Sequence, residues 1–448
     1  MRYLPKSPSE RGEMLAAVGV KSIDELFESI PVEFRLNRPL NLPGPLSEAE
    51  IIRYFQARAA ENSRGFTSFL GAGVYSHLRS VVADSLIQRG EFLTSYTPYQ
   101  AEFAQGTLTA IFEFQTLMCQ LTGQEVANAS MYDGSTALTE AILMAHRLTG
   151  RRLVLMARSV HPQYRQVFAT YARNLGIAIE EVGYSSSGQI DLRSLTPEKI
   201  QAAAAIVVQS PNFFGVLEDI PGVADAAHSG ESLLVATVAE ALSLGIVRPP
   251  AEADIVAMEG QSLGVAPSFG GPYVGVIATR EKFVRQMPGR LAGQTTDEDG
   301  NRGFVLTLAT REQHIRRERA TSNICTNEAL FALAATIHLC LLGRQGVREV
   351  AAQNLAKARY ALAALENIPG VRRSFDGPFF NEFTLEFPRA VKLVNASLLR
   401  EKIIGPYVLG AHYPDLSKRG LVCVTETVPR EEIDRFAAAV RKILESPI

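Results

Sequence analysis

The stretch Ala205-Ile206-Val207-Val208-Gln209 is one of five short apolar runs in the middle of the chain; the others are 153–157, 233–238, 255–258 and 274–278. Strands of a parallel sheet are covered on both faces, so they read as continuous apolar runs rather than as alternating ones. Helical patterns such as 162–175 and 223–228 lie between the runs. This repeat predicts an α/β domain with a mainly parallel sheet, whose ligands bind at the carboxyl ends of the strands.

The segments on either side predict an arm before this domain and a smaller domain after it. Residues 1–60 alternate short amphipathic helices with Pro-rich connections, so we expect an arm that packs against something larger. Further elements are expected as a helix at 101–121, a helical region at 327–365 with a break at 343–346, strands at 379–387 and 420–425, and helices from 397 and at 430–444. The predicted parts are an N-terminal helical arm (1–60), a large α/β domain (61–330), and a linking helix with a small C-terminal α+β domain (331–448).

Composition excludes several classes of function. The 448 residues are 46% hydrophobic and 21% charged, as in ordinary globular proteins. Lysine and arginine number 45 and aspartate and glutamate 47, so the net charge is −2. Nucleic-acid binding usually requires a basic excess or a basic stripe. We therefore expect no nucleic-acid partner.

The cysteines and the N-terminus indicate a reduced, soluble protein. Cys119, Cys325, Cys340 and Cys423 are far apart and form no Cys-X-X-Cys pair, so neither a disulfide framework nor a metal site is supported. The N-terminal residues lack the apolar core of a signal peptide, and no run reaches the roughly 18 apolar residues of a membrane span. We expect a cytoplasmic protein without membrane association.

An aromatic loop is the first candidate for a functional site. It reads Glu91-Phe92-Leu93-Thr94-Ser95-Tyr96-Thr97-Pro98-Tyr99-Gln100. Two tyrosines on either side of a proline, with polar side chains nearby, suit a rigid loop that presents hydrogen-bonding aromatic rings to a small ligand. The alternative is a buried aromatic turn.

A second candidate is the turn Asp133-Gly134-Ser135-Thr136, which opens a helical run. A helix N-terminus exposes backbone N–H groups and carries roughly half a positive charge, so it can hold a phosphate. The alternative is an ordinary helix cap made by Asp133 or Ser135.

Three more candidates are single residues or a charge cluster. His161 follows the 153–157 run and could stack on an aromatic ring or donate a hydrogen bond; a loop histidine fixed by the next proline is equally consistent. Glu240 follows the 233–238 run, where a carboxylate could pair with a pyridinium nitrogen, or where it could simply be an exposed strand end. The cluster Arg311, Arg316, Arg317 and Arg319 favours a solvated or subunit-facing helix over an anion clamp.

A series of longer stretches along nearly the whole chain resembles one known family. The stretches are Met14-Leu15-Ala16-Ala17-Val18-Gly19, Phe69-Leu70-Gly71-Ala72-Gly73-Val74-Tyr75, Thr94-Ser95-Tyr96-Thr97-Pro98-Tyr99-Gln100, Ala127-Asn128-Ala129-Ser130-Met131-Tyr132-Asp133-Gly134, Pro211-Asn212-Phe213-Phe214-Gly215 and Glu259-Gly260-Gln261-Ser262-Leu263-Gly264. They are similar to the glycine cleavage system P-proteins (glycine dehydrogenase, decarboxylating), and among these to the N-terminal-half subunit of the two-subunit bacterial form. The resemblance implies the fold of the fold-type I enzymes that use pyridoxal 5′-phosphate (PLP).

The resemblance also implies a reaction and a cofactor. The family decarboxylates glycine on PLP and transfers the aminomethyl group to the lipoyl arm of the H-protein. PLP requires a Schiff-base lysine, whose amine must be neutral to react, and in the cofactor-bearing half of the family a His-Lys pair stands where this chain has Gly260-Gln261. An amide cannot form a Schiff base, and a guanidinium stays protonated. The chain has only nine lysines, none of them in a position to replace this one.

We therefore expect a subunit that is inactive alone and whose homologous partner subunit holds PLP, in an α2β2 assembly that also meets the H-protein. Asp133, Gly134, Ser135, Thr136, His161, Glu240 and Gln261 would line a vestigial cofactor pocket. Tyr96, Tyr99 and Gln100 are the candidates for a shared active site, and Arg311–Arg319 for the interface. The alternatives are an independent PLP enzyme, which the missing lysine disfavours, and a scaffold or regulatory pseudoenzyme.

Overall fold

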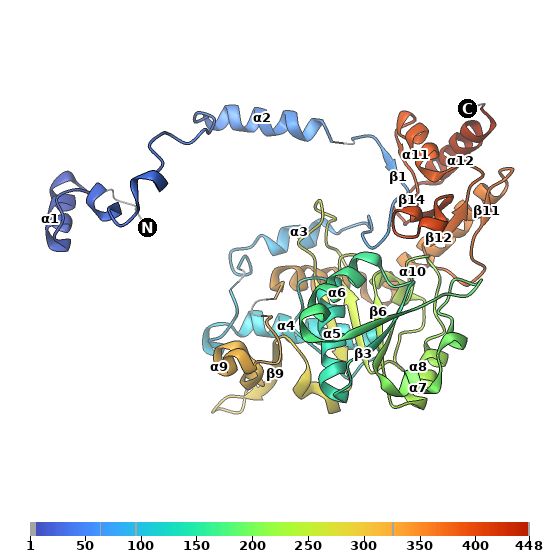
Figure 1. The fold of residues 1–448 in the computed structure, drawn as a ribbon, viewed down its shortest axis with the longest axis horizontal. Helices are drawn as coiled ribbons and strands as arrows, with labels where there is room; N and C mark the ends of the chain where they lie inside the picture. Colours follow the sequence, from blue (N-terminus) through green and yellow to red (C-terminus); the bar gives the residue numbers. More distant parts are fainter. Residues whose placement is uncertain (1–5, 63, 95, 325–326, 447–448) are drawn as a thin grey trace. The chain divides into compact units, whose positions relative to one another are not determined.

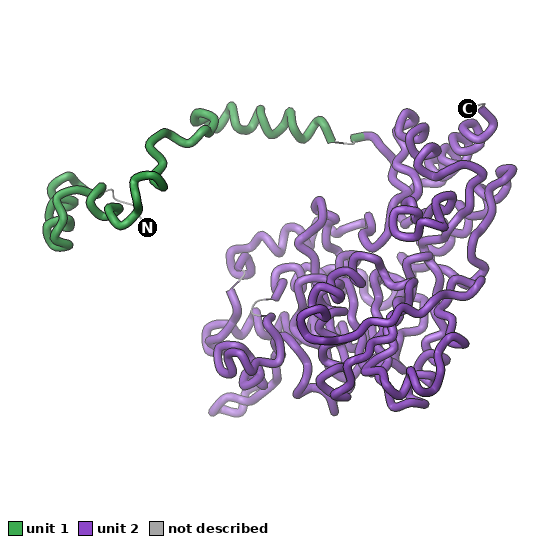
Figure 2. The backbone as a smooth tube through the Cα atoms, viewed as in Figure 1, with its two compact units in different colours: residues 1–64 green, residues 65–448 purple. Residues whose placement is uncertain are grey.

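The computed structural model describes residues 6–62, 64–94, 96–324 and 327–446. It divides the chain into two compact units, Met1–Arg64 and Gly65–Ile448 (Figure 2). Ser95 of the predicted aromatic loop and Cys325 lie outside the described residues.

The first unit consists of short helices whose side chains all remain accessible to solvent. They are α1 (Pro8–Val18), the 3-10 turns η1 (Asp24–Phe27) and η2 (Val32–Phe34), and α2 (Glu48–Ala60), and none of their residues is buried. Capping boxes at Ser7 and Ser47 start the two α-helices, because each serine accepts the N–H of a glutamate three residues on. Local capping thus shapes this unit, whereas its apolar side chains, such as Phe34 and Phe55, remain exposed.

A seven-stranded sheet forms the centre of the second unit (Figure 1). Its order is β2-β8-β7-β6-β5-β3-β4, with β2 (Val126–Ala127), β3 (Leu153–Ala157), β4 (Ala178–Val182), β5 (Ala203–Gln209), β6 (Leu233–Val238), β7 (Ile255–Glu259) and β8 (Gly275–Thr279). Every residue of β5, β7 and β8 is buried, as expected for strands that are covered on both faces. The helices α4 (Gln105–Thr122), α5 (Gly134–Thr149), α6 (Pro162–Leu175), α7 (Pro197–Ala202) and α8 (Ile220–Ser229) cover it.

The sheet confirms the predicted mainly parallel architecture but differs from the sequence analysis in three details. The run at 274–278 is β8, which is antiparallel to both of its neighbours. The strand β4 was not predicted, because its sequence Ala-Ile-Glu-Glu-Val holds two charges that an edge strand can expose. The helix expected from residue 101 begins at Gln105, after a separate 3-10 turn, η3 (Ala101–Phe103).

The helix α10 (Ala329–Glu366) leads from the large domain to the last part of the chain. The predicted break is confirmed at Gly343, whose backbone is not helical (φ 60°, ψ 178°). Among the described helices, α10 alone has the length and apolar composition of a membrane span. It contacts α3 (Val81–Ile87), α4 and α12 (Arg430–Glu445), as the core helix of a globular domain does.

The C-terminal part is a small antiparallel sheet with two helices. The strand order is β11-β12-β15-β14, with β11 (Arg372–Arg373), β12 (Glu382–Glu386), β14 (Tyr407–Val408) and β15 (Arg419–Cys423). Its helices are α11 (Val391–Arg400), which begins six residues before the position predicted at 397, and α12. A short strand far upstream, β1 (Thr67–Ser68), pairs with β13 (Ile403–Ile404), so the chain enters the second unit through its small domain.

Candidate functional site

Four of the predicted groups lie where strands of the sheet end and helices begin. Asp133 is the N-cap of α5, His161 follows β3 and is the N-cap of α6, and Glu240 follows β6. Gln261 comes two residues after β7. In an open α/β sheet this edge is the ligand-binding edge. We call these groups, together with Gly134, Ser135 and Thr136, the cofactor-type pocket.

The amide of Gln261 is fully engaged by the backbones of Tyr75 and Val265. Its Oε1 accepts the N–H of Tyr75 (2.9 Å), and its Nε2 donates to the carbonyl oxygens of Tyr75 (2.9 Å) and Val265 (2.8 Å). Gln261 is buried, with 1% of its surface exposed. The side chain therefore acts as a structural bridge and has no free functional group.

Glu240 is buried and forms an ion pair, so the alternative of an exposed strand end is wrong. Its Oε2 lies 3.0 Å from Nε2 of His77, while Nδ1 of His77 lies 2.8 Å from Oε2 of Glu426. Burial by itself lowers the pKa of His77, but the charges and hydrogen bonds of Glu240 and Glu426 outweigh burial and raise this pKa to about 10. His77 is therefore an imidazolium held between two carboxylates. Asn381 also donates to Glu240 (3.1 Å).

His161 is fixed in position against two aromatic rings, one tilted by 30° and one edge-on, so neither contact is a parallel stack. Its ring lies 4.8 Å from that of Tyr164 and 4.7 Å from that of Phe213. Nδ1 accepts the N–H of Gln163, so Nε2 carries the proton and donates to the carbonyl oxygen of Ala72 (2.9 Å). Burial lowers the pKa of His161 to about 4, so the ring is neutral.

The N-terminus of α5 is occupied by carboxyl groups of the chain itself. Asp133 accepts the N–H of Thr136 (2.8 Å) and the hydroxyl of Ser135 (2.7 Å), which makes it a helix cap. Glu259 accepts the N–H of Gly134 through Oε2 (2.8 Å) and that of Gln261 through Oε1 (2.9 Å). Burial raises the pKa of Glu259 to about 8, although these N–H donors oppose the rise. The helix end thus already holds acidic groups where a phosphate would bind.

The predicted aromatic loop forms a separate cluster on the surface. Tyr96 and Tyr99 are 72% and 46% exposed, so the alternative of a buried turn is wrong for both rings. Their ring centroids are 5.9 Å apart, and Tyr99 makes a similar contact with His314. Arg290, itself buried, donates to the hydroxyl of Tyr99 (2.8 Å) and lies over its ring. Gln100, the third predicted residue of the loop, is exposed beside it.

The arginine cluster is not the continuous helix that we expected. Only α9 (Gln313–Arg316) is helical, between two 3-10 turns. Arg311 is buried, and its guanidinium donates to the carbonyl oxygens of Met287, Gly289 and Leu308. This residue is structural, whereas Arg316, Arg317 and Arg319 are exposed.

A family model described as "Glycine cleavage system P-protein" matches residues 1–440. A protein of Koribacter versatilis, described as "Probable glycine dehydrogenase (decarboxylating) subunit 1", is 54% identical over 98% of this chain and 100% of its own length. A protein of Moorella thermoacetica with the same description is 49% identical over 99% of this chain and 100% of its own. The chain belongs to the glycine cleavage system P-protein family.

A solved P-protein agrees with this assignment in three dimensions. The crystal structure of a glycine decarboxylase (P-protein) in an inhibitor-bound form is 43% identical, covers 99% of this chain and 100% of its own, and superposes with a TM-score of 0.90. A glutamate decarboxylase of Lactobacillus brevis (12% identical, 94% of this chain and 99% of its own, TM-score 0.70) shares the fold. The fold is therefore that of fold-type I PLP enzymes.

The pocket of this P-protein chain does not fit covalently bound PLP. The group that PLP requires is an amine, and Gln261 supplies an amide whose donors and acceptor are all engaged. All nine lysines lie in the described residues, and none forms a hydrogen bond or ion pair with a side chain of the pocket residues. Lys357, for example, donates to the backbone carbonyls of Glu426 and Val428.

Several residues that surround the pocket were not predicted from the sequence. They are Tyr75, His77, Glu259, Glu382 and Glu426. Glu259 could have been found, because it is the acidic end of an apolar strand. The others are far away in sequence, and only the tertiary structure brings them to the sheet edge.

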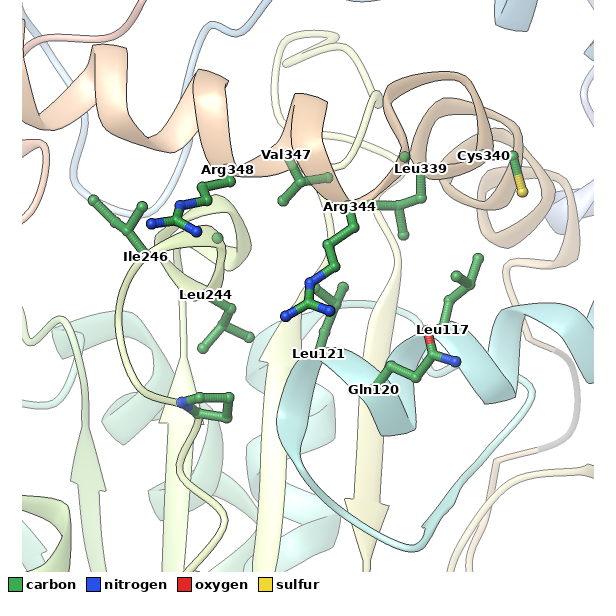
Figure 3. Close-up of a pocket in the computed structure, with 13 residues that line it drawn as sticks. Leu117, Gln120, Leu121, Leu244, Ile246, Leu339, Cys340, Arg344, Val347 and Arg348 are labelled. Carbon is green, nitrogen blue, oxygen red and sulfur yellow. The ribbon is translucent and has the colours of Figure 1, made fainter.

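A cavity of about 830 Å³ lies elsewhere, beside the kink of α10 (Figure 3). Leu117 and Leu121 of α4 line it together with Leu244, and Arg344 and Arg348 extend into it from α10. No residue of the cofactor-type pocket or of the aromatic loop lines it. In the described residues, no group of three His, Cys, Asp or Glu side chains could hold a metal ion.

Proposed function

We propose that this P-protein chain is the subunit of a glycine decarboxylase that does not hold the cofactor. Together with a homologous, lysine-bearing partner subunit it decarboxylates glycine and transfers the aminomethyl group to the lipoyl arm of the H-protein. The observation that carries the proposal is the engaged amide of Gln261 at the position expected for the Schiff-base lysine. PLP belongs to the partner subunit, because a neutral amine is required and this chain presents none at the pocket.

We propose a cytoplasmic α2β2 assembly, and two surfaces of the chain support the need for a partner. The helices of residues 1–64 bury no residue of their own, so their apolar side chains gain hydrophobic stabilisation only on another surface. The exposed Tyr96 and Tyr99 are of the residue type that is enriched at protein interfaces. Their position on a loop fixed by Arg290 suits a contribution to the partner's active site.

The chain alone is expected to show no glycine decarboxylation, because it cannot bind PLP covalently. The same chain co-expressed with its partner subunit should be active. The measurement is release of carbon dioxide from labelled glycine in the presence of PLP and lipoylated H-protein. Activity of the chain alone would contradict the proposal and favour an independent PLP enzyme.

Replacing Tyr99 by phenylalanine tests whether the loop shares the active site. The change removes the hydroxyl that accepts the hydrogen bond of Arg290. A hydrogen bond with a charged partner contributes about 1.5–3 kcal/mol, so we expect kcat/KM of the complex to fall by roughly 10- to 150-fold.

Tyr360→Phe is the matched control, because it also removes a hydroxyl that is bonded to a charged side chain, Asp434, but in the small domain. This control should keep full activity. If Tyr99→Phe also kept full activity in an intact complex, the chain would be a scaffold rather than part of the catalytic site.

A further inference from the structure

One continuous segment, Gly71 to His77, contacts the cofactor-type pocket through three of its residues. Ala72 accepts from His161, Tyr75 pairs with Gln261, and His77 pairs with Glu240. These pocket residues come from three different strand ends of the large domain. The segment therefore extends across the pocket from His161 to Glu240.

The small domain holds this segment at both ends. Upstream, the carbonyl of Phe69 accepts the N–H of Cys423, and the Phe69 ring stacks on Phe436 with centroids 4.1 Å apart. Downstream, the hydroxyl of Thr425 donates to the carbonyl of Ser76 (2.7 Å), and Glu426 accepts from the N–H of Leu78 (2.7 Å). The segment is thus part of the small domain that lies over the large-domain pocket.

A buried carboxylate of the small domain fixes the middle of the segment. Glu382 on β12 accepts the N–H of Ala72 through Oε1 (2.6 Å) and the hydroxyl of Tyr75 through Oε2 (2.9 Å). Burial raises the pKa of Glu382 to about 7, and these two donors oppose the rise. The N–H of Ala72 and the hydroxyl of Tyr75 are therefore both bonded within the protein.

Two glycines allow the segment to lie this close to His161 of the pocket and to Glu382 of the small domain. A Cβ atom at Gly73, whose φ is +97°, would lie 2.8 Å from Nε2 of His161. A Cβ atom at Gly71 would lie 2.3 Å from Oε1 of Glu382. Neither contact is possible for a side chain, so the Gly-Ala-Gly sequence suits direct contact with the pocket walls.

We propose that residues Gly71–His77 are an internal plug, which takes the place of PLP in this subunit and fastens the small domain over the large one. The plug matches the pocket chemically at two positions. A cationic imidazole meets Glu240, where a pyridinium would pair, and a backbone amide meets Gln261, where a Schiff base would form. The acidic groups Asp133 and Glu259 complete the replacement at the helix end.

The plug predicts slow amide exchange in a segment without helix or strand. In the complex with the partner subunit, hydrogen–deuterium exchange of a peptide covering 70–78 should be at least about 100-fold slower than in an unstructured chain, since its N–H groups at Ala72, Tyr75 and Leu78 are bonded. Mass spectrometry distinguishes the peptides of the two subunits. Further PLP, added to the complex that already carries its own, should not change exchange at 70–78 or at 131–138.

Gln261→Ala should accelerate exchange at 70–78 by roughly tenfold or more, because both bonds to Tyr75 are lost. Gln115→Ala is the matched control: this buried glutamine bridges the backbone of Ala292 in the same two-bond manner. It should accelerate exchange near 292 and leave 70–78 unchanged.

Three results would overturn the plug. The first is exchange of the wild-type segment at the rate of an unstructured chain. The second is a PLP-dependent change at 70–78 or 131–138, which would show that the pocket opens to the cofactor. The third is a Gln261→Ala variant with unchanged exchange at 70–78. The first two results come from the wild-type chain, so they test the plug even if Gln261→Ala does not fold.

Discussion

In the variant His77→Ala the free energy of unfolding is expected to be about 3–5 kcal/mol lower than in the wild type, because Glu240 and Glu426 stay buried without their shared cation. The side chains of His77 and Glu240 are only 3% and 2% exposed, so water cannot replace the imidazolium. Removing one member of a buried ion pair costs more than the pair contributes, since the remaining charge stays desolvated.

Chemical denaturation of the complex at neutral pH measures this effect. His228→Ala is a matched control, because His228 also lies 2.8 Å from a carboxylate, that of Asp254, but its side chain is 42% exposed. Asp254 is buried, but without His228 it keeps Arg280 (3.7 Å) and the N–H of Leu234 (2.9 Å), so the control should cost about 0–1 kcal/mol. If both variants lost the same small amount of stability, the His77 cluster would not be the buried ion pair described here.

The stabilisation of the folded protein by His77 should also decrease as the pH rises. Its pKa of about 10 in the folded protein exceeds the ordinary value of 6.5, so its stabilisation is complete below pH 6.5 and is lost as the pH rises towards 10. Glu240 and Glu426 face His77 directly. Burial and the charge of His77 lower the pKa of the neighbouring His338, so a positive charge on His338 is disfavoured beside His77. The Tm difference between wild type and His77→Ala should therefore shrink between pH 6.5 and pH 10.

Phe69→Ala is expected to lower the free energy of unfolding by about 3–5 kcal/mol, the usual range when a fully buried phenylalanine is replaced by alanine. Its ring is 0% exposed, is stacked on Phe436, and belongs to the core of the small domain. The side chain of Phe69 also holds the start of the segment that continues into the pocket. The change therefore leaves a cavity in the core and removes the contact with Phe436 that holds this segment.

Thermal unfolding of the complex measures the loss. Phe269→Ala is the control, because Phe269 is 97% exposed, and it should change stability by less than about 0.5 kcal/mol. A loss below about 1 kcal/mol for Phe69→Ala would mean that residue 69 is not part of the small-domain core.

The sequence predicts the large domain well because its signals are local. Continuous apolar runs and the pattern of α6, which was expected at its observed bounds, depend on neighbouring residues alone. The antiparallel direction of β8 was missed, since a buried antiparallel strand has the same apolar run as a parallel one. The short strand β1 was missed because two residues carry no period, and it exists only through its pairing with β13.

The positions of the candidate residues follow from the sequence in part. His161 and Glu240 are expected at the carboxyl ends of strands from the topology of an α/β sheet, whereas Gln261 was singled out only through the family resemblance. Their partners in Gly71–His77 come from a segment that the chain places there through contacts with the small domain, more than 300 residues away in sequence. The burial of Glu240 could not be predicted, because it depends on His77.

The location of PLP tests the central claim most directly. The co-expressed complex is treated with borohydride, which fixes PLP to its lysine, and the digested subunits are analysed by mass spectrometry. We expect the modified lysine in the partner subunit and none among the nine lysines of this chain. A modified lysine in this chain would contradict both the assignment of Gln261 and the division of roles between the two subunits.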